Sequence, residues 1–143
     1  MWSVLLSPAP DDDGVPDIVL SLTAIILLLR PLDTWWLSPF APAIACLVIV
    51  NRAIRRAALT WCVLATLVAA DVVSGWPLAD NHIYLLAYWC LAIALALVGA
   101  ASAATLAASS RWLVGGAFAM AVVWKAVLSP DYIDGRFFRV TLL

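Results

Sequence analysis

The chain has 143 residues, of which 66% are hydrophobic and only 12% are charged. Eight Lys or Arg side chains and nine Asp side chains give a formal net charge of −1, and the mean hydropathy is +1.04. Such a composition lacks the polar surface that a soluble globule needs, and the sequence has no basic stripe that could bind nucleic acid. The composition predicts an integral membrane protein whose main partner is the lipid bilayer.

Five hydrophobic segments follow an N-terminal stretch, 1–14, that we expect to form an interfacial or loose tail. A helix of about 20 apolar residues crosses a hydrocarbon layer of roughly 30 Å, and most of the segments approach or exceed that length. They cover residues 15–32, 35–50, 53–74, 82–110 and 111–128. Residues 129–143 have the pattern of an interfacial amphipathic tail. The sequence predicts an all-α, polytopic transmembrane helix bundle over 15–128.

Prolines mark the limits of the first two segments. Pro16 and Asp17 suit the first turn of a helix. Pro31 disfavours helical backbone at Arg30, so the first helix should end there. In the second segment Pro39 and Pro42 break the first half. This segment is therefore either a tilted span or a re-entrant piece.

The fourth segment contains 28 consecutive uncharged residues, 83–110. At about 1.5 Å per residue this run is more than long enough to cross a membrane. We expect one continuous helix over 82–110, then a short turn at Ser109 and Ser110 and a last helix that stops at Ser129-Pro130.

Small residues recur every four positions on this expected helix. One stripe contains Ala92, Ala96, Ala100, Ala104 and Ala108, and a second contains Gly99, Ala103 and Ala107. Small residues at this spacing allow helix backbones to approach closely in a bilayer. We expect the stripe to pack against another helix of the chain; the alternatives are homodimerisation through 92–108 and a membrane protein partner.

Arginines between the second and third segments predict the orientation of the chain. Arg52, Arg55 and Arg56 mark that connection as cytoplasmic, because basic loops are retained on the cytoplasmic side. If the third segment spans the membrane, His82 lies on the opposite face.

The three cysteines give no indication of a metal centre. Cys46, Cys62 and Cys90 lie inside apolar segments without Cys-x-x-Cys spacing, and His82 is the single histidine. We expect buried free thiols and no metal ion.

Ionisable side chains in or near apolar segments are candidates for function, because their burial in a membrane is unfavourable. Four residues meet this criterion: Arg30, Asp71, His82 and Lys125. His82 follows Asp80 and Asn81, either of which can cap a helix. His82 is then a neutral general base at the positive end of the helix dipole, or simply an interfacial histidine. Asp71 is expected at the interface.

Lys125 lies about one turn before the end of the last segment. It either extends to the headgroups or faces the bundle, where burial favours the neutral amine of a general base. With five spans, His82, Lys125, Asp131 and Asp134 gather at one membrane face. We expect His82 within about 10–12 Å of the turn 131–135, which is the diameter of one helix. The predicted catalytic residues are His82 and Lys125, with Asp80, Asn81, Asp131 and Asp134 beside them.

Two stretches resemble a known family. Residues 80–86 (DNHIYLL), which open a long apolar helix, and residues 125–138 (KAVLSPDYIDGRFF) resemble segments of the bacterial "horizontally transferred transmembrane" proteins, relatives of vitamin K-dependent γ-carboxylase. The stretches cover 21 of 143 residues. The resemblance implies a membrane enzyme that couples the oxidation of a reduced vitamin K quinone to the carboxylation of glutamate in a substrate. Such proteins are longer and have more spans, so this chain is expected to be a truncated or partial member.

Three hypotheses about function follow. The first is quinone-linked chemistry, which needs a lateral pocket for an apolar quinone beside His82 and the turn 131–135. The second is a small membrane scaffold or assembly subunit, held to a larger partner by the alanine stripe. The third is a small redox-partner membrane protein of the four-helix DoxX or MauE kind, which a compact bundle such as this one resembles in size.

Overall fold

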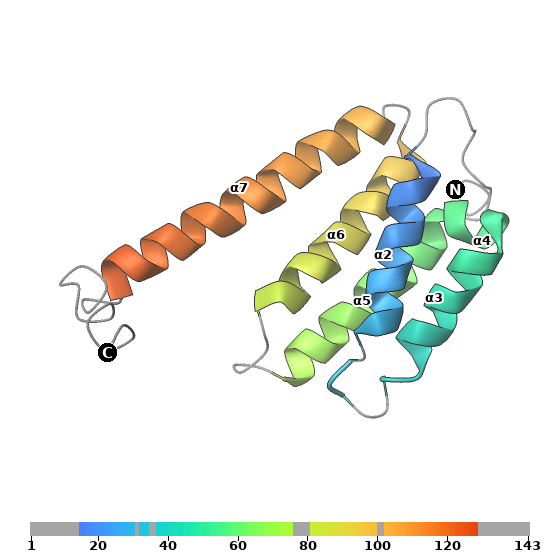
Figure 1. The fold of residues 1–143 in the computed structure, drawn as a ribbon, viewed down its shortest axis with the longest axis horizontal. Helices are drawn as coiled ribbons and strands as arrows, with labels where there is room; N and C mark the ends of the chain where they lie inside the picture. The colour runs from blue at the N-terminus through green and yellow to red at the C-terminus, as the bar shows by residue number, and fades with distance from the viewer. Residues whose placement is uncertain (1–14, 31, 35–36, 76–80, 100–101, 129–143) are drawn as a thin grey trace, which may run out of the picture. The chain divides into compact units, whose positions relative to one another are not determined.

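The computed structural model describes residues 15–30, 32–34, 37–75, 81–99 and 102–128, and for residues 81, 82, 102, 124–126 and 128 it describes the backbone alone. All regular elements of this part of the chain are α-helices (Figure 1). They are α2 (Asp17–Leu29), α3 (Phe40–Val50), α4 (Arg52–Arg56), α5 (Ala58–Ser74), α6 (Asn81–Val98) and α7 (Ser102–Leu128). The predicted all-α class is confirmed for these residues. The chain forms two compact units, Met1–Ser109 and Ser110–Leu143, which meet within α7.

In the first unit, α2, α3, α5 and α6 run alternately up and down (Figure 1). Helix α2 packs on α3, α5 packs along α6, and α3 also contacts α5. One end of this bundle carries the start of α2 and the short helix α4, and we call it the arginine end. The opposite end carries the C-terminus of α5 and the start of α6, and we call it the Asp71 end.

The prolines act at helix starts and ends. Pro16 precedes α2, and its carbonyl accepts a bond from the amide of Val19 at 2.9 Å. Arg30, before Pro31, has extended backbone and ends α2 as predicted. Pro39 and Pro42 lie at the start of α3. The first four amides of a helix need no intrahelical acceptor, so these prolines open the helix instead of breaking it.

The third predicted segment is divided into α4 and α5. Asn51 caps α4 through Oδ1, which accepts from the amides of Ala53 at 2.9 Å and Ile54 at 3.3 Å. Ala57 has extended backbone and separates the two helices. The indole of Trp61 in α5 donates to the Arg55 carbonyl at 2.7 Å and holds the end of α4 against α5.

The prediction of one continuous helix over 82–110 is wrong. Helix α6 ends at Val98, Gly99 forms a bend, and α7 begins at Ser102. Glycine disfavours helix by about 1 kcal/mol relative to alanine, and it is the weakest helix former in this uncharged run. The predicted turn at Ser109 and Ser110 is also wrong, since both residues lie inside α7.

The break divides the alanine stripe between two helices. Ala92 and Ala96 are buried within the bundle, as the packing prediction requires. Ala104 and Ala108 belong to α7 and are exposed. The prediction that the stripe faces another helix therefore holds for its α6 half alone.

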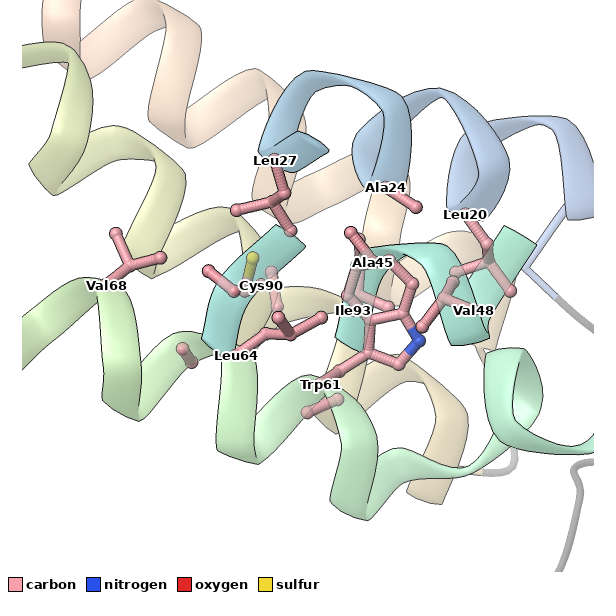
Figure 2. Packing of buried hydrophobic residues seen from close by; sticks show 14 of the residues in the cluster. Leu20, Ala24, Leu27, Ala45, Val48, Trp61, Leu64, Val68, Cys90 and Ile93 are labelled. Carbon is pink, nitrogen blue, oxygen red and sulfur yellow. The ribbon is translucent and has the colours of Figure 1, made fainter. Parts of the chain in front are cut away.

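The core of the first unit is built around Trp61, which is fully buried. Figure 2 shows its indole among side chains from α2, α3 and α6, with Leu64 and Val68 following along α5. The buried side chains of α2 recur at helical spacing, as in Leu20, Ala24 and Leu27. Four separate helices thus share one apolar core.

One stretch of the described residues, Ala103–Val123 in α7, is long and apolar enough to cross a membrane by length and composition. Four shorter apolar helices accompany it: Asp17–Leu29, Phe40–Val50, Ala58–Ser74 and Ile83–Val98. The prediction of five membrane spans is therefore still an interpretation of these helices.

The burial of Ala96 predicts that Ala96→Leu destabilises the bundle. Extra methylenes in a packed core typically cost about 1–3 kcal/mol, and Ala96 has no exposed surface. Thermal unfolding in detergent, followed by circular dichroism, measures the effect. The matched control is Ala104→Leu, at an exposed position of α7; equal destabilisation by both substitutions would contradict the division of the stripe.

Candidate functional site

The arginine end contains the densest group of charges in the described residues. Asp17, in the first turn of α2, faces three arginines of α4. Its carboxylate lies 3.0 Å from Arg56 Nε, 3.4 Å from Arg52 Nε and 3.8 Å from Arg55 Nε. The Asp17–Arg56 contact is a hydrogen bond between side chains 39 positions apart. Asp17 thus ties the start of α2 to the connection between α3 and α5.

The three arginines differ in exposure. The Arg56 side chain is 7% exposed, Arg55 16% and Arg52 57%. Arg55 donates from Nη1 to the Ile49 carbonyl at 3.3 Å, while its buried Nε makes no hydrogen bond. At 3.8 Å, Asp17 attracts Arg55 Nε as an ion but lies beyond hydrogen-bond distance. Arg56 anchors the cluster, whereas Arg52 presents its guanidinium to the surroundings.

At the opposite end, Asp71 is buried near the C-terminus of α5. Its Oδ1 accepts from the amide of Thr34 at 2.7 Å, and its Oδ2 accepts from that of Asp33 at 3.3 Å. Both amides belong to the connection between α2 and α3. Asp71 therefore holds this connection against α5. The sequence predicted only that Asp71 lies at the membrane interface and did not predict this anchoring role.

A third polar contact, between α6 and α2, lies in the middle of the bundle. The Trp89 indole of α6 donates to Thr23 Oγ1 of α2 at 3.0 Å, and Thr23 donates in turn to the Val19 carbonyl at 2.8 Å. Thr23 is buried, so the pair satisfies two polar groups inside an apolar core. Trp61 and Trp89 thus both lie between helices, Trp61 fully buried and Trp89 partly buried against the core.

The predicted site residues fall in both units. Asn81 and His82 lie in the first turn of α6, at the Asp71 end, with only their backbone described. Lys125 lies in the last turn of α7, also with only its backbone described. Asp80, Asp131 and Asp134 lie outside the described residues.

His82 was expected to lie close to the turn 131–135 because a turn at Ser109 and Ser110 would make the last two helices antiparallel neighbours. That turn is absent, since α7 continues through both residues. His82 belongs to the unit Met1–Ser109, and Lys125 with the two aspartates belongs to Ser110–Leu143. Their convergence stays a prediction that needs a different connection from the one we expected.

Within the part of the chain that the structure describes, no three His, Cys or acidic residues are grouped so that they could hold a metal ion. The cysteines are free thiols: Cys90 is buried, Cys62 half-buried and Cys46 exposed. The prediction of buried thiols is confirmed for Cys90 and wrong for Cys46, which lies on the outer face of α3.

Comparison with known proteins gives no match, either to a family model, to a curated protein or to a solved structure.

The contact between Asp17 and Arg56 can be tested with a double-mutant cycle. Asp17→Asn and Arg56→Gln should each lower the free energy of unfolding in detergent by about 1–3 kcal/mol, because each removes one partner of a charged hydrogen bond. The double variant should lose less than the sum, since the two side chains contact each other. Asp33→Asn, an exposed aspartate at the other end, should change stability by no more than about 0.5 kcal/mol. Strict additivity would contradict the contact.

Proposed function

We propose that this chain is a multi-pass integral membrane protein whose bundle α2–α6 lies in the bilayer. The observation that carries the proposal is the separation of charge from the bundle sides. In the described residues of Met1–Ser109, every charged side chain lies at one of the two ends, and none lies within 18–29, 40–50, 57–70 or 83–98. A soluble bundle would carry charges along its outer faces.

The sides of the bundle are apolar where they are exposed. Large apolar side chains cover the outer faces of all four helices: Leu22, Ile26 and Leu29 on α2, Leu47 and Val50 on α3, Val63 and Val73 on α5, and Leu91 and Leu95 on α6. Exposed apolar surface this extensive needs lipid or a partner protein to cover it. Lipid covers all sides at once, and it tolerates the exposed Cys46 thiol.

Helix lengths are compatible with this placement. At about 1.5 Å per residue, α5 with 17 residues and α6 with 18 residues reach about 26 and 27 Å. The hydrocarbon layer is roughly 30 Å thick, and the membrane adapts to a few ångströms of mismatch. Helix α3, with 11 residues, reaches only about 17 Å. Because α3 nevertheless runs from the Asp71 end to the arginine end, the proposed placement needs α3 to cross as a short span, to which the membrane must adapt, and not as a re-entrant piece.

Membrane integration and topology are tested in one set of variants. With the three native cysteines replaced by alanine, Ala53→Cys at the arginine end and Ser74→Cys at the Asp71 end should react with an impermeant maleimide from opposite sides of the membrane. Both positions are exposed in the structure. The protein should stay in the membrane fraction after a carbonate wash. Release by carbonate would contradict integration, and labelling of both sites from one side would contradict the topology.

For the molecular activity we propose quinone-linked chemistry of the carboxylase-like membrane family, carried out by this chain or by a longer protein that contains it. What supports the proposal is the place of the stretch 80–86: α6 begins at Asn81, so this stretch opens an apolar helix as the resemblance requires. The described residues at this end add two carboxylates: Asp71, whose two oxygens already accept amide bonds, and the exposed Asp33. We propose that the polar contacts to a quinone come from His82 and its neighbours.

Quinone binding is tested by purifying the full chain with native lipid and extracting bound quinone. We expect quinone in about molar proportion, and a roughly tenfold lower content in His82→Ala, the equivalent of about 1.4 kcal/mol. Tyr88→Phe, an exposed position on the same helix, is the control and should retain quinone. Equal quinone content in His82→Ala and in the unaltered chain would exclude His82 as a contact. A protein partner recovered in molar proportion without quinone would favour the scaffold hypothesis.

A further inference from the structure

The arginine end combines two kinds of surface: guanidinium groups and exposed aliphatic side chains. Val50, two residues before Arg52, is 80% exposed, and Ile18, next to Asp17, is 67% exposed. Arg52 itself is 57% exposed. A ligand that satisfies both surfaces carries an anionic group joined to long apolar chains.

In the described residues, three guanidinium groups of this cluster lie around one carboxylate. A guanidinium carries about five N–H donors, whereas a carboxylate offers about four lone-pair positions. Asp17 is also 35% exposed, so one edge of the carboxylate faces the surroundings. Arg52 and Arg56 make further interactions besides those with Asp17, and Arg55 Nε makes no hydrogen bond. Arg52 is the most exposed guanidinium of the cluster, so a phosphate group can approach it without breaking the Asp17–Arg56 bond.

Phosphate suits this arrangement better than a carboxylate ligand does. Arginine binds phosphate oxygens through pairs of parallel N–H bonds, and its planar group is weakly hydrated compared with an ammonium ion. The positive-inside pattern places this end at the cytoplasmic leaflet, where anionic phospholipids gather. The neighbouring apolar faces of α2 and α3 can then contact the acyl chains.

We propose that the arginine end binds the phosphate headgroup of an anionic phospholipid, with Arg52 as the contacting side chain and Arg56 and Asp17 as its support. The proposal rests on the membrane location proposed above. Binding joins α2 and α4 through the lipid and so stabilises the same contact that Asp17 makes.

The full chain in a neutral detergent provides the test. Phosphatidylglycerol should raise the melting temperature by several degrees over an equal concentration of phosphatidylcholine, and native mass spectrometry should show phosphatidylglycerol retained on the protein. In Arg52→Gln both effects should fall to the phosphatidylcholine level. Arg111→Gln, an exposed arginine in α7, is the matched control and should respond like the unaltered chain.

Three results would overturn the proposal. Equal stabilisation by the two lipids would show that the anionic headgroup is not recognised. An undiminished response in Arg52→Gln would show that Arg52 is not the contacting side chain. Equal stabilisation by inorganic phosphate alone would identify a free anion as the ligand. If the protein resists carbonate extraction, each of these results overturns the lipid proposal alone and leaves the membrane proposal intact. Release by carbonate would instead contradict the membrane proposal itself.

Discussion

The ion pairs between Asp17 and the arginines of α4 are the interaction on which the bundle depends. Asp17 begins α2, and the arginines belong to the connection between α3 and α5, so their contact decides where α2 lies against the other helices. In lipid the apolar surfaces of helices gain little by touching one another, because acyl chains are equally apolar. If the bundle lies in the bilayer as proposed, a directional contact between the half-buried Asp17 and the buried Arg56 selects one arrangement among several that pack equally well.

Two further polar contacts act in the same way at other levels of the bundle. Asp71 holds the connection between α2 and α3 at the opposite end, and the Thr23–Trp89 pair joins α2 to α6 in the middle. Each ties α2 or the connection that follows it to the α5–α6 pair. The apolar core around Trp61 supplies packing (Figure 2). The three polar contacts supply the register of the helices.

The break between α6 and α7 changes how function must be sought in this chain. A single long helix would have presented one continuous small-residue stripe and a fixed antiparallel neighbour. Instead, the buried half of the stripe belongs to the core and the exposed half belongs to a helix that enters the second unit. The candidate residues at the start of α6 are therefore best tested together with the Asp71 end, to which the structure assigns them.

The sequence by itself determined the helical class, the limits of α2 at Pro16 and Arg30, and the apolar character of the bundle sides, because proline geometry and hydropathy act locally. It also singled out the arginine cluster, though only as a mark of orientation. Tertiary structure decided the partner of that cluster, the anchoring role of Asp71 and the bond between Thr23 and Trp89, which join residues 37 to 66 positions apart. The break at Gly99 was not predicted from the sequence: a glycine is only weakly unfavourable in a helix, and Gly115 and Gly116 remain helical in α7. Propensity differences of about 1 kcal/mol are outweighed by packing, and contacts between distant residues leave no local signal in a single sequence.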